Sequence, residues 1–157
     1  TYHRFYWAPR WETAWKRMDH SNIFLLIAGT YTPLTIALLN RSDATILLSV
    51  VWAGASAGIL LSLFWPTAPR WLSTLVYVAL GWVAVWYLPQ LWAGGGPAIV
   101  WLIVAGGLLY TVGALVYGLK KPDPSPTWFG FHEIFHAFTV AAWACHCVAV
   151  YLAVLGG

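Results

Sequence analysis

Two histidines near the C-terminus have a spacing that suits metal binding. Residues 131–136 read FHEIFH. If this segment is helical, His132 and His136 lie one turn apart, so their imidazoles share a face and can bind one metal ion. The simpler alternative is a pair of polar histidines at a membrane interface. The apolar flanking sequence favours metal binding.

Two further residues could reach the same level of a helical bundle. Asp19 begins the first long apolar segment, and His3 ends a shorter one at the N-terminus. Three histidines and a carboxylate would then converge from three helices, which suits an open zinc site. In such a site a nearby carboxylate orients the zinc-bound water, and Asp19 could serve as the catalytic base. Alternatively, Asp19 only caps the N-terminus of its helix.

The other polar residues in the apolar segments have plainer interpretations. His20 points about 100° away from Asp19 on a helix, so it is expected to face the interface. His146 lies about 15 Å deeper than His136 at 1.5 Å per residue, and we expect it to form a hydrogen bond within the bundle; a proton relay is the alternative. Cys145 and Cys147 point in different directions on a helix, cannot pair with each other, and are interpreted as inert buried thiols.

The same histidine segment also matches the pattern HExxH. In a metalloprotease of that type Glu133 would be the general base. Such an intramembrane protease needs a carboxylate ligand from a later helix, and only His146 and apolar residues follow. Glu133 is more simply interpreted as an acidic residue at a helix start, where the helix dipole favours it.

The composition places these residues in a membrane. Hydrophobic residues make up 61% of the 157 residues and charged residues only 8%, whereas about 25% charged residues are normal in soluble domains. The mean hydropathy is +0.70. No basic patch suggests a nucleic-acid partner, so membrane lipid is the expected contact.

Apolar segments long enough to cross about 30 Å of hydrocarbon predict a polytopic, all-α transmembrane bundle. We interpret residues 1–157 as one such domain, with 1–7 as the end of an earlier helix and 8–18 as an interfacial connector. The five expected complete spans are residues 19–40, 44–65, 71–92, 97–119 and 129–155.

Positive charge is strongly asymmetric between the two sides of this arrangement. The side with the loops around residues 8–18, 66–70 and 120–127 carries Arg4, Arg10, Lys16, Arg17, Arg70, Lys120 and Lys121. The other side carries only Arg41. Because cytoplasmic loops are enriched in Lys and Arg, we expect the side with these seven residues to face the cytoplasm and the C-terminus to lie outside. The expected location is the inner (plasma) membrane.

Gly54 and Gly58 form a GxxxG pattern in the second span. Small residues at this spacing let helices approach closely. They indicate packing within the chain or, alternatively, a homo-oligomer interface.

Several segments together resemble the hemolysin III branch of the progestin and adiponectin receptor superfamily. The matching stretches are residues 2–4 (YHR), 18–21 (MDHS), 28–33 (AGTYTP) and 132–136 (HEIFH), with His146 downstream. The resemblance implies a seven-helix fold, a cytoplasmic N-terminus, and zinc near the cytoplasmic face, held by His3, His132 and His136 with Asp19 close by. The family pattern also has a serine one turn before the first histidine and a helix before it. This chain begins at Thr1, so we expect an N-terminal segment to be missing.

The resemblance supports more than one function. Related alkaline ceramidases suggest a zinc-dependent membrane hydrolase of lipid amides, with Asp19 as general base and an acyl chain held by the apolar bundle. The alternative is a non-enzymatic protein: receptor-like, pore-forming as the name hemolysin implies, or an accessory subunit of a membrane complex.

Overall fold

A computed structural model of the chain describes residues 9–65, 69–125 and 128–156. These residues form α1 (Pro9–Leu38), α2 (Arg41–Phe64), α3 (Arg70–Trp82), the 3₁₀ helix η2 (Val83–Tyr87), α4 (Leu88–Leu119) and α5 (Phe131–Leu155). Apart from an isolated bridge between Ser125 and Phe129, this part of the chain contains no β-structure. The predicted all-α bundle is confirmed.

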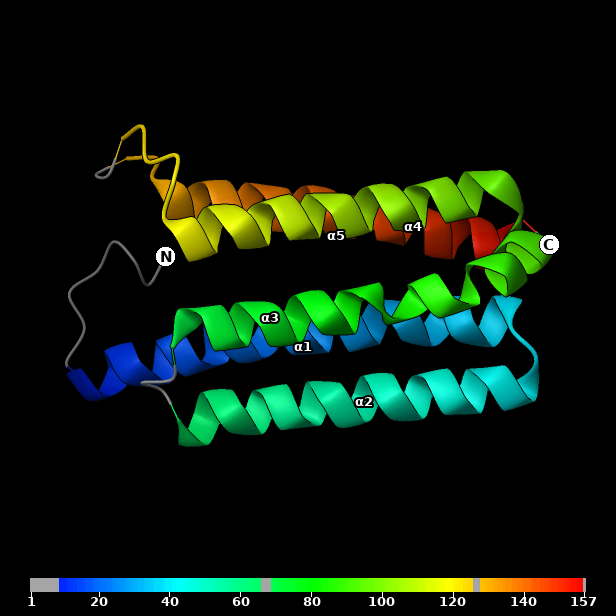
Figure 1. The fold of residues 1–157 in the computed structure, drawn as a ribbon, viewed down its shortest axis with the longest axis horizontal. Coiled ribbons are helices and arrows are strands. Elements are labelled where there is room, and N and C mark those ends of the chain that lie inside the picture. Colours follow the sequence, from blue (N-terminus) through cyan, green and yellow to red (C-terminus); the bar gives the residue numbers. More distant parts are fainter. Residues whose placement is uncertain (1–8, 66–68, 126–127, 157) are drawn as a thin grey trace.

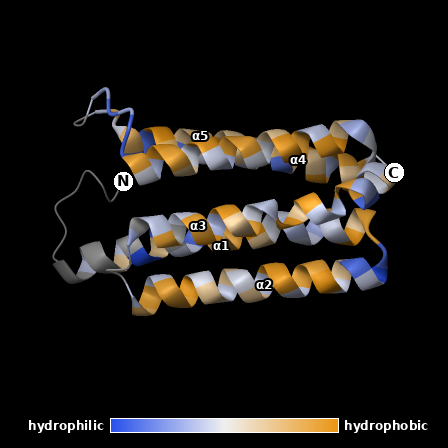
Figure 2. Ribbon diagram, in the orientation of Figure 1, coloured by the Kyte–Doolittle hydropathy of each residue, from blue (hydrophilic) through white to orange (hydrophobic). Residues whose placement is uncertain are grey.

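The helices lie roughly parallel to one long axis of the molecule (Figure 1). The starts of α1, α3 and α5 and the ends of α2 and α4 lie at one end, and the α1–α2 turn and the end of α5 lie at the other. Hydrophobic residues run along the helices, while hydrophilic ones concentrate at the α1–α2 turn and in the α4–α5 loop (Figure 2). Within the described residues, four helical stretches are long and apolar enough to cross a membrane: 17–38, 41–64, 74–119 and 131–155.

The third of these stretches contains a reversal of the chain. Sequence analysis predicted separate spans with a loop at 93–96. Instead, helix continues from α3 through η2 into α4, and within α4 only Gly96 leaves helical geometry, with φ 72° and ψ 179°. A positive φ costs glycine little, because it has no Cβ. The chain turns back there, so α3 and the main part of α4 lie as separate rods (Figure 1).

The first helix starts earlier than the sequence predicted. The predicted connector at 8–18 is helical from Pro9 onward and continues without a break into the apolar part of α1. Proline suits the first position of a helix, and the following Ala, Glu, Lys and Arg residues favour helix. Asp19 therefore lies inside a helix rather than at its start.

The two glycines of the GxxxG pattern are used for packing inside the chain. A Cβ at Gly58 would lie 2.4 Å from the ring of Phe24 in α1, and one at Gly54 would lie 2.7 Å from Leu80 in α3. Phe24 is only 1% exposed, and its ring fills the space left by Gly58. The prediction of packing within the chain is confirmed.

Gly58→Ala is expected to destabilise the bundle, because the added methyl group must displace a buried ring. Overpacking of this kind typically costs about 1–3 kcal/mol. Thermal unfolding in detergent would measure the change. Gly118→Ala in α4 is the control, since a Cβ there meets nothing within 4 Å. An unfolding temperature for Gly58→Ala equal to or above that of the control would contradict this packing.

Candidate metal centre

Side-chain caps fix the start of α5, and with it the direction of the two histidines. The Gly130 N–H donates to Glu133 Oε2 at 3.0 Å, and the Phe131 N–H donates to Asp123 Oδ1 at 3.1 Å. These acceptors satisfy backbone donors that a helix start leaves without partners. The helix-start role predicted for Glu133 is confirmed.

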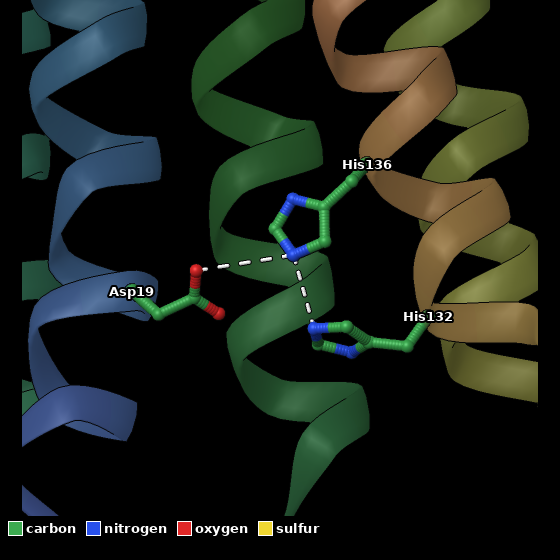
Figure 3. Close-up of side chains that lie close together, drawn as sticks. All are labelled: Asp19, His132 and His136. Atoms are coloured by element: carbon green, nitrogen blue, oxygen red, sulfur yellow. Dashed lines mark hydrogen bonds and ion pairs between the residues drawn. The ribbon is translucent and has the colours of Figure 1, made fainter. Parts of the chain in front are cut away.

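His132 and His136 point toward each other from consecutive turns of α5 (Figure 3). Their Nε2 atoms are 3.0 Å apart, and their rings are inclined by 71°. Tyr117 of α4 is buried beside this pair, with its ring centroid 5.8 Å from that of His132 and 5.0 Å from that of Phe135. This aromatic packing from α4 supports the His132 ring.

Asp19 approaches the histidine pair from α1 (Figure 3). Its Oδ1 lies 3.8 Å from His136 Nε2, and the ligand atoms of Asp19, His132 and His136 all lie within 4.8 Å of one another. The side chains of His136 and Asp19 are 38% and 22% exposed, so the cluster is open on one side. Because α1 begins at Pro9, the alternative that Asp19 caps the helix N-terminus is wrong.

The donor set fits a zinc ion. Ligand atoms about 2.0–2.1 Å from a tetrahedral zinc lie about 3.3 Å from one another. The two histidine nitrogens, 3.0 Å apart, lie close to that spacing, whereas Asp19 Oδ1, 3.8 Å from His136 Nε2, lies farther away. Two neutral imidazoles can also form a direct hydrogen bond at 3.0 Å, which is the alternative to metal binding.

The remaining predicted polar residues are not part of this cluster as the structure describes it. The predicted ligand His3 and the side chain of His20 lie outside the described residues. His146 lies near Ile103 of α4, with its Nε2 3.3 Å from the Ile103 carbonyl oxygen, so the predicted hydrogen bond within the bundle is confirmed. Cys145 and Cys147 are partly buried free thiols.

Sequence reasoning missed Tyr117 and Asp123. Tyr117 meets His132 only because α4 packs along α5, and no spacing in the sequence reveals that contact. Asp123 lies eight residues before Phe131, away from the usual N-cap position, so no sequence pattern indicates its contact with the α5 backbone.

Comparisons with known proteins agree with the resemblance. A family model described as Haemolysin-III related matches residues 1–147. The chain is 36% identical over 136 residues to a protein named Hemolysin-3 homolog from Bacillus subtilis (strain 168), a match that covers 85% of this chain and 61% of the relative. It is 33% identical over 146 residues to Hemolysin-3 from Bacillus cereus, a match that covers 92% of this chain and 64% of that relative.

The chain thus spans less than two thirds of the length of these curated relatives. No solved structure matches it. The family match covers nearly the whole chain, and the apolar helical stretches are long enough to cross a membrane. The chain is therefore an integral membrane protein that belongs to the haemolysin-III-related family.

Proposed function

We propose that this protein binds zinc near the cytoplasmic face of the inner membrane, with His132, His136 and His3 as ligands. The observation that carries the proposal is the convergence of Asp19 from α1 with the histidine pair of α5. Intramembrane ionisable residues are costly and are functional candidates by default. The convergence of two histidines and a carboxylate is hard to explain as an accident of helix packing.

Asp19 is proposed to hold and deprotonate a water molecule rather than to bind the metal. Its 3.8 Å separation from His136 Nε2 exceeds the roughly 3.3 Å expected between two ligands of one tetrahedral zinc. That longer distance favours a carboxylate that acts through water, and the exposed side of the cluster admits water and substrate.

Hydrolysis of a lipid amide is the proposed reaction. When bound, zinc would polarise the substrate carbonyl and lower the pKa of a coordinated water toward about 7. Asp19 Oδ1 would accept the proton of the attacking water, and the apolar surface of the helices would hold the acyl chain. The cluster lies near the start of α5, at the end of the bundle that carries the hydrophilic α4–α5 loop, which suits a substrate with a polar headgroup (Figure 2).

The metalloprotease alternative is disfavoured. Its general base would be Glu133, yet the Glu133 carboxylate accepts the Gly130 N–H at the start of α5. A lytic, non-enzymatic function is the second candidate, because the relatives bear the name Hemolysin-3.

One reconstitution experiment compares the two candidates. Protein in vesicles that contain a fluorescent ceramide and an enclosed dye is treated with a chelator and then reloaded with zinc. We expect ceramide cleavage to disappear with the chelator and to return with zinc, without release of the dye. Dye release without amide cleavage would contradict the hydrolase proposal and favour the lytic one.

The proposed orientation rests on charge at the two ends of the bundle. Lys120 and Lys121 lie in the α4–α5 loop at the end where α1 starts, and Arg41 begins α2 at the opposite end (Figure 1). We expect Lys121 to face the cytoplasm and the C-terminus to face outward.

Cysteine labelling tests this orientation. In a variant with Cys145 and Cys147 changed to Ser, a cysteine added after Gly157 should react with an impermeant thiol reagent on intact cells. Lys121→Cys should react only after the cells are opened. Labelling of position 121 on intact cells would overturn the proposed topology.

A further inference from the structure

Two adjoining cavities lie inside the bundle around His146, which is one of the residues that line both. They leave about 20 Å³ and 30 Å³ for the centre of a water molecule. The walls shared by both cavities are formed by Thr30, Tyr31, Gly81 and His146. One water occupies a space of about 10–15 Å³, so each cavity admits at least one.

Most polar groups in the cavity walls already have partners. The Tyr31 hydroxyl donates to the Gly81 carbonyl oxygen at 2.7 Å and accepts the Ala84 N–H at 2.9 Å. Trp82 Nε1 donates to Thr111 Oγ1 at 2.9 Å, and that hydroxyl donates to the Gly107 carbonyl oxygen. These groups therefore need no ligand.

Tyr110 and His146 differ from the other wall residues. The Tyr110 hydroxyl oxygen is buried and has no hydrogen-bond partner among the described residues. In the contact with the Ile103 carbonyl oxygen, His146 Nε2 must be the donor, which leaves Nδ1 of the neutral ring as an acceptor. The two ring centroids are 5.6 Å apart. One donor–acceptor hydroxyl and one acceptor nitrogen thus remain to be satisfied, on two side chains that line the same cavity.

A glycine in α4 fixes the position of the imidazole. A Cβ at Gly106 would lie 2.3 Å from His146 Nε2 and 3.1 Å from the Ala142 carbonyl oxygen. Any larger residue at 106 would push the ring away from α4. The bundle therefore makes room for a histidine in its apolar interior, and this arrangement does not serve the candidate metal centre, which lies nearer the start of α5.

We propose that Tyr110 and His146 form a water-binding site inside the membrane domain. An unsatisfied hydroxyl in an apolar interior destabilises the fold, and buried waters typically make about three hydrogen bonds to such groups. One or two waters in the cavities bridge the Tyr110 hydroxyl and the His146 imidazole. This site is separate from the proposed zinc site and does not depend on it.

Radiolytic hydroxyl-radical labelling of the full chain in detergent, with water as the probe, tests the site. Radicals formed from internal water label adjacent buried side chains, so Tyr110 and His146 should be modified several-fold faster than Phe24. Phe24 is 1% exposed and lines neither cavity. Labelling of Tyr110 no faster than Phe24 would overturn the proposal.

Two variants sharpen the test. Gly106→Ala should move the imidazole and lower the labelling of Tyr110 several-fold, while Gly118→Ala, which meets nothing within 4 Å, should leave it unchanged. If Gly106→Ala does not fold, Tyr110→Phe replaces it as the test. Labelling of His146 should then fall several-fold, because the bridging water has lost the Tyr110 hydroxyl as a hydrogen-bond partner. Unchanged labelling of His146 in Tyr110→Phe would exclude the bridging water.

Discussion

His136→Ala is expected to remove bound zinc from the purified protein. His136 lies at the centre of the cluster, because its Nε2 is the atom close to both His132 Nε2 and Asp19 Oδ1. Loss of a group that only supports a ligand lowers metal affinity by about 10–100-fold, so loss of a ligand itself should exceed the upper end of that range. Zinc content by mass spectrometry and competition with a chelator would measure the effect.

His146→Ala is the matched control for that variant. It makes the same change on the same helix, at a residue that contacts Ile103 rather than the cluster. We expect this control to retain zinc at the level of the unmodified protein. If His136→Ala also retained zinc at that level, the histidine pair would be a hydrogen-bonded pair and not a metal site.

Asp19→Asn is expected to separate metal binding from catalysis. Asparagine keeps the shape and hydrogen-bonding reach of the side chain but cannot take a proton. If Asp19 acts through water, the variant should keep zinc with affinity lowered by no more than about 10–100-fold and should lose lipid-amide hydrolysis. Both quantities would be measured on the same reconstituted preparation.

Asp43→Asn controls for the loss of a carboxylate. Asp43 accepts a hydrogen bond from Asn40 Nδ2 at the start of α2, away from the cluster, so this variant should keep both zinc and activity. Complete loss of zinc in Asp19→Asn would show that Asp19 is itself a ligand. Normal zinc binding with unchanged activity would remove the proposed base and with it the case for an enzyme.

The sequence predicted the helical class of the fold well and the ends of its helices less well. Membrane helices must be apolar over most of their length, so composition alone identifies them. The start of α1 was missed because residues 9–18 are too polar to count as part of an apolar span. Several of these residues nevertheless favour helix. The chain does turn at 93–96, as predicted. The prediction of a loop there was wrong, because Gly96 is the one residue within α4 that departs from helical geometry.

The candidate site could be predicted where it depends on the position of a residue along its helix, and not where it depends on how two helices are rotated against each other. The spacing of His132 and His136 was sufficient to place their side chains together, since both lie on α5. The approach of Asp19 followed from matching depths in two spans. The packing of Tyr117 against His132, and of Tyr110 beside His146, depends on how α4 rotates against α5, and no pattern in the sequence records that rotation.

X-ray absorption at the zinc edge of the purified protein tests the central proposal most directly. The proposal predicts stoichiometric zinc with nitrogen ligands at about 2.0–2.1 Å and the outer scattering of imidazole rings. The imidazole contribution should disappear together with the metal in His136→Ala. A protein that is saturated with zinc salt and then desalted, yet holds no zinc or holds it only with non-imidazole ligands, would contradict the zinc site.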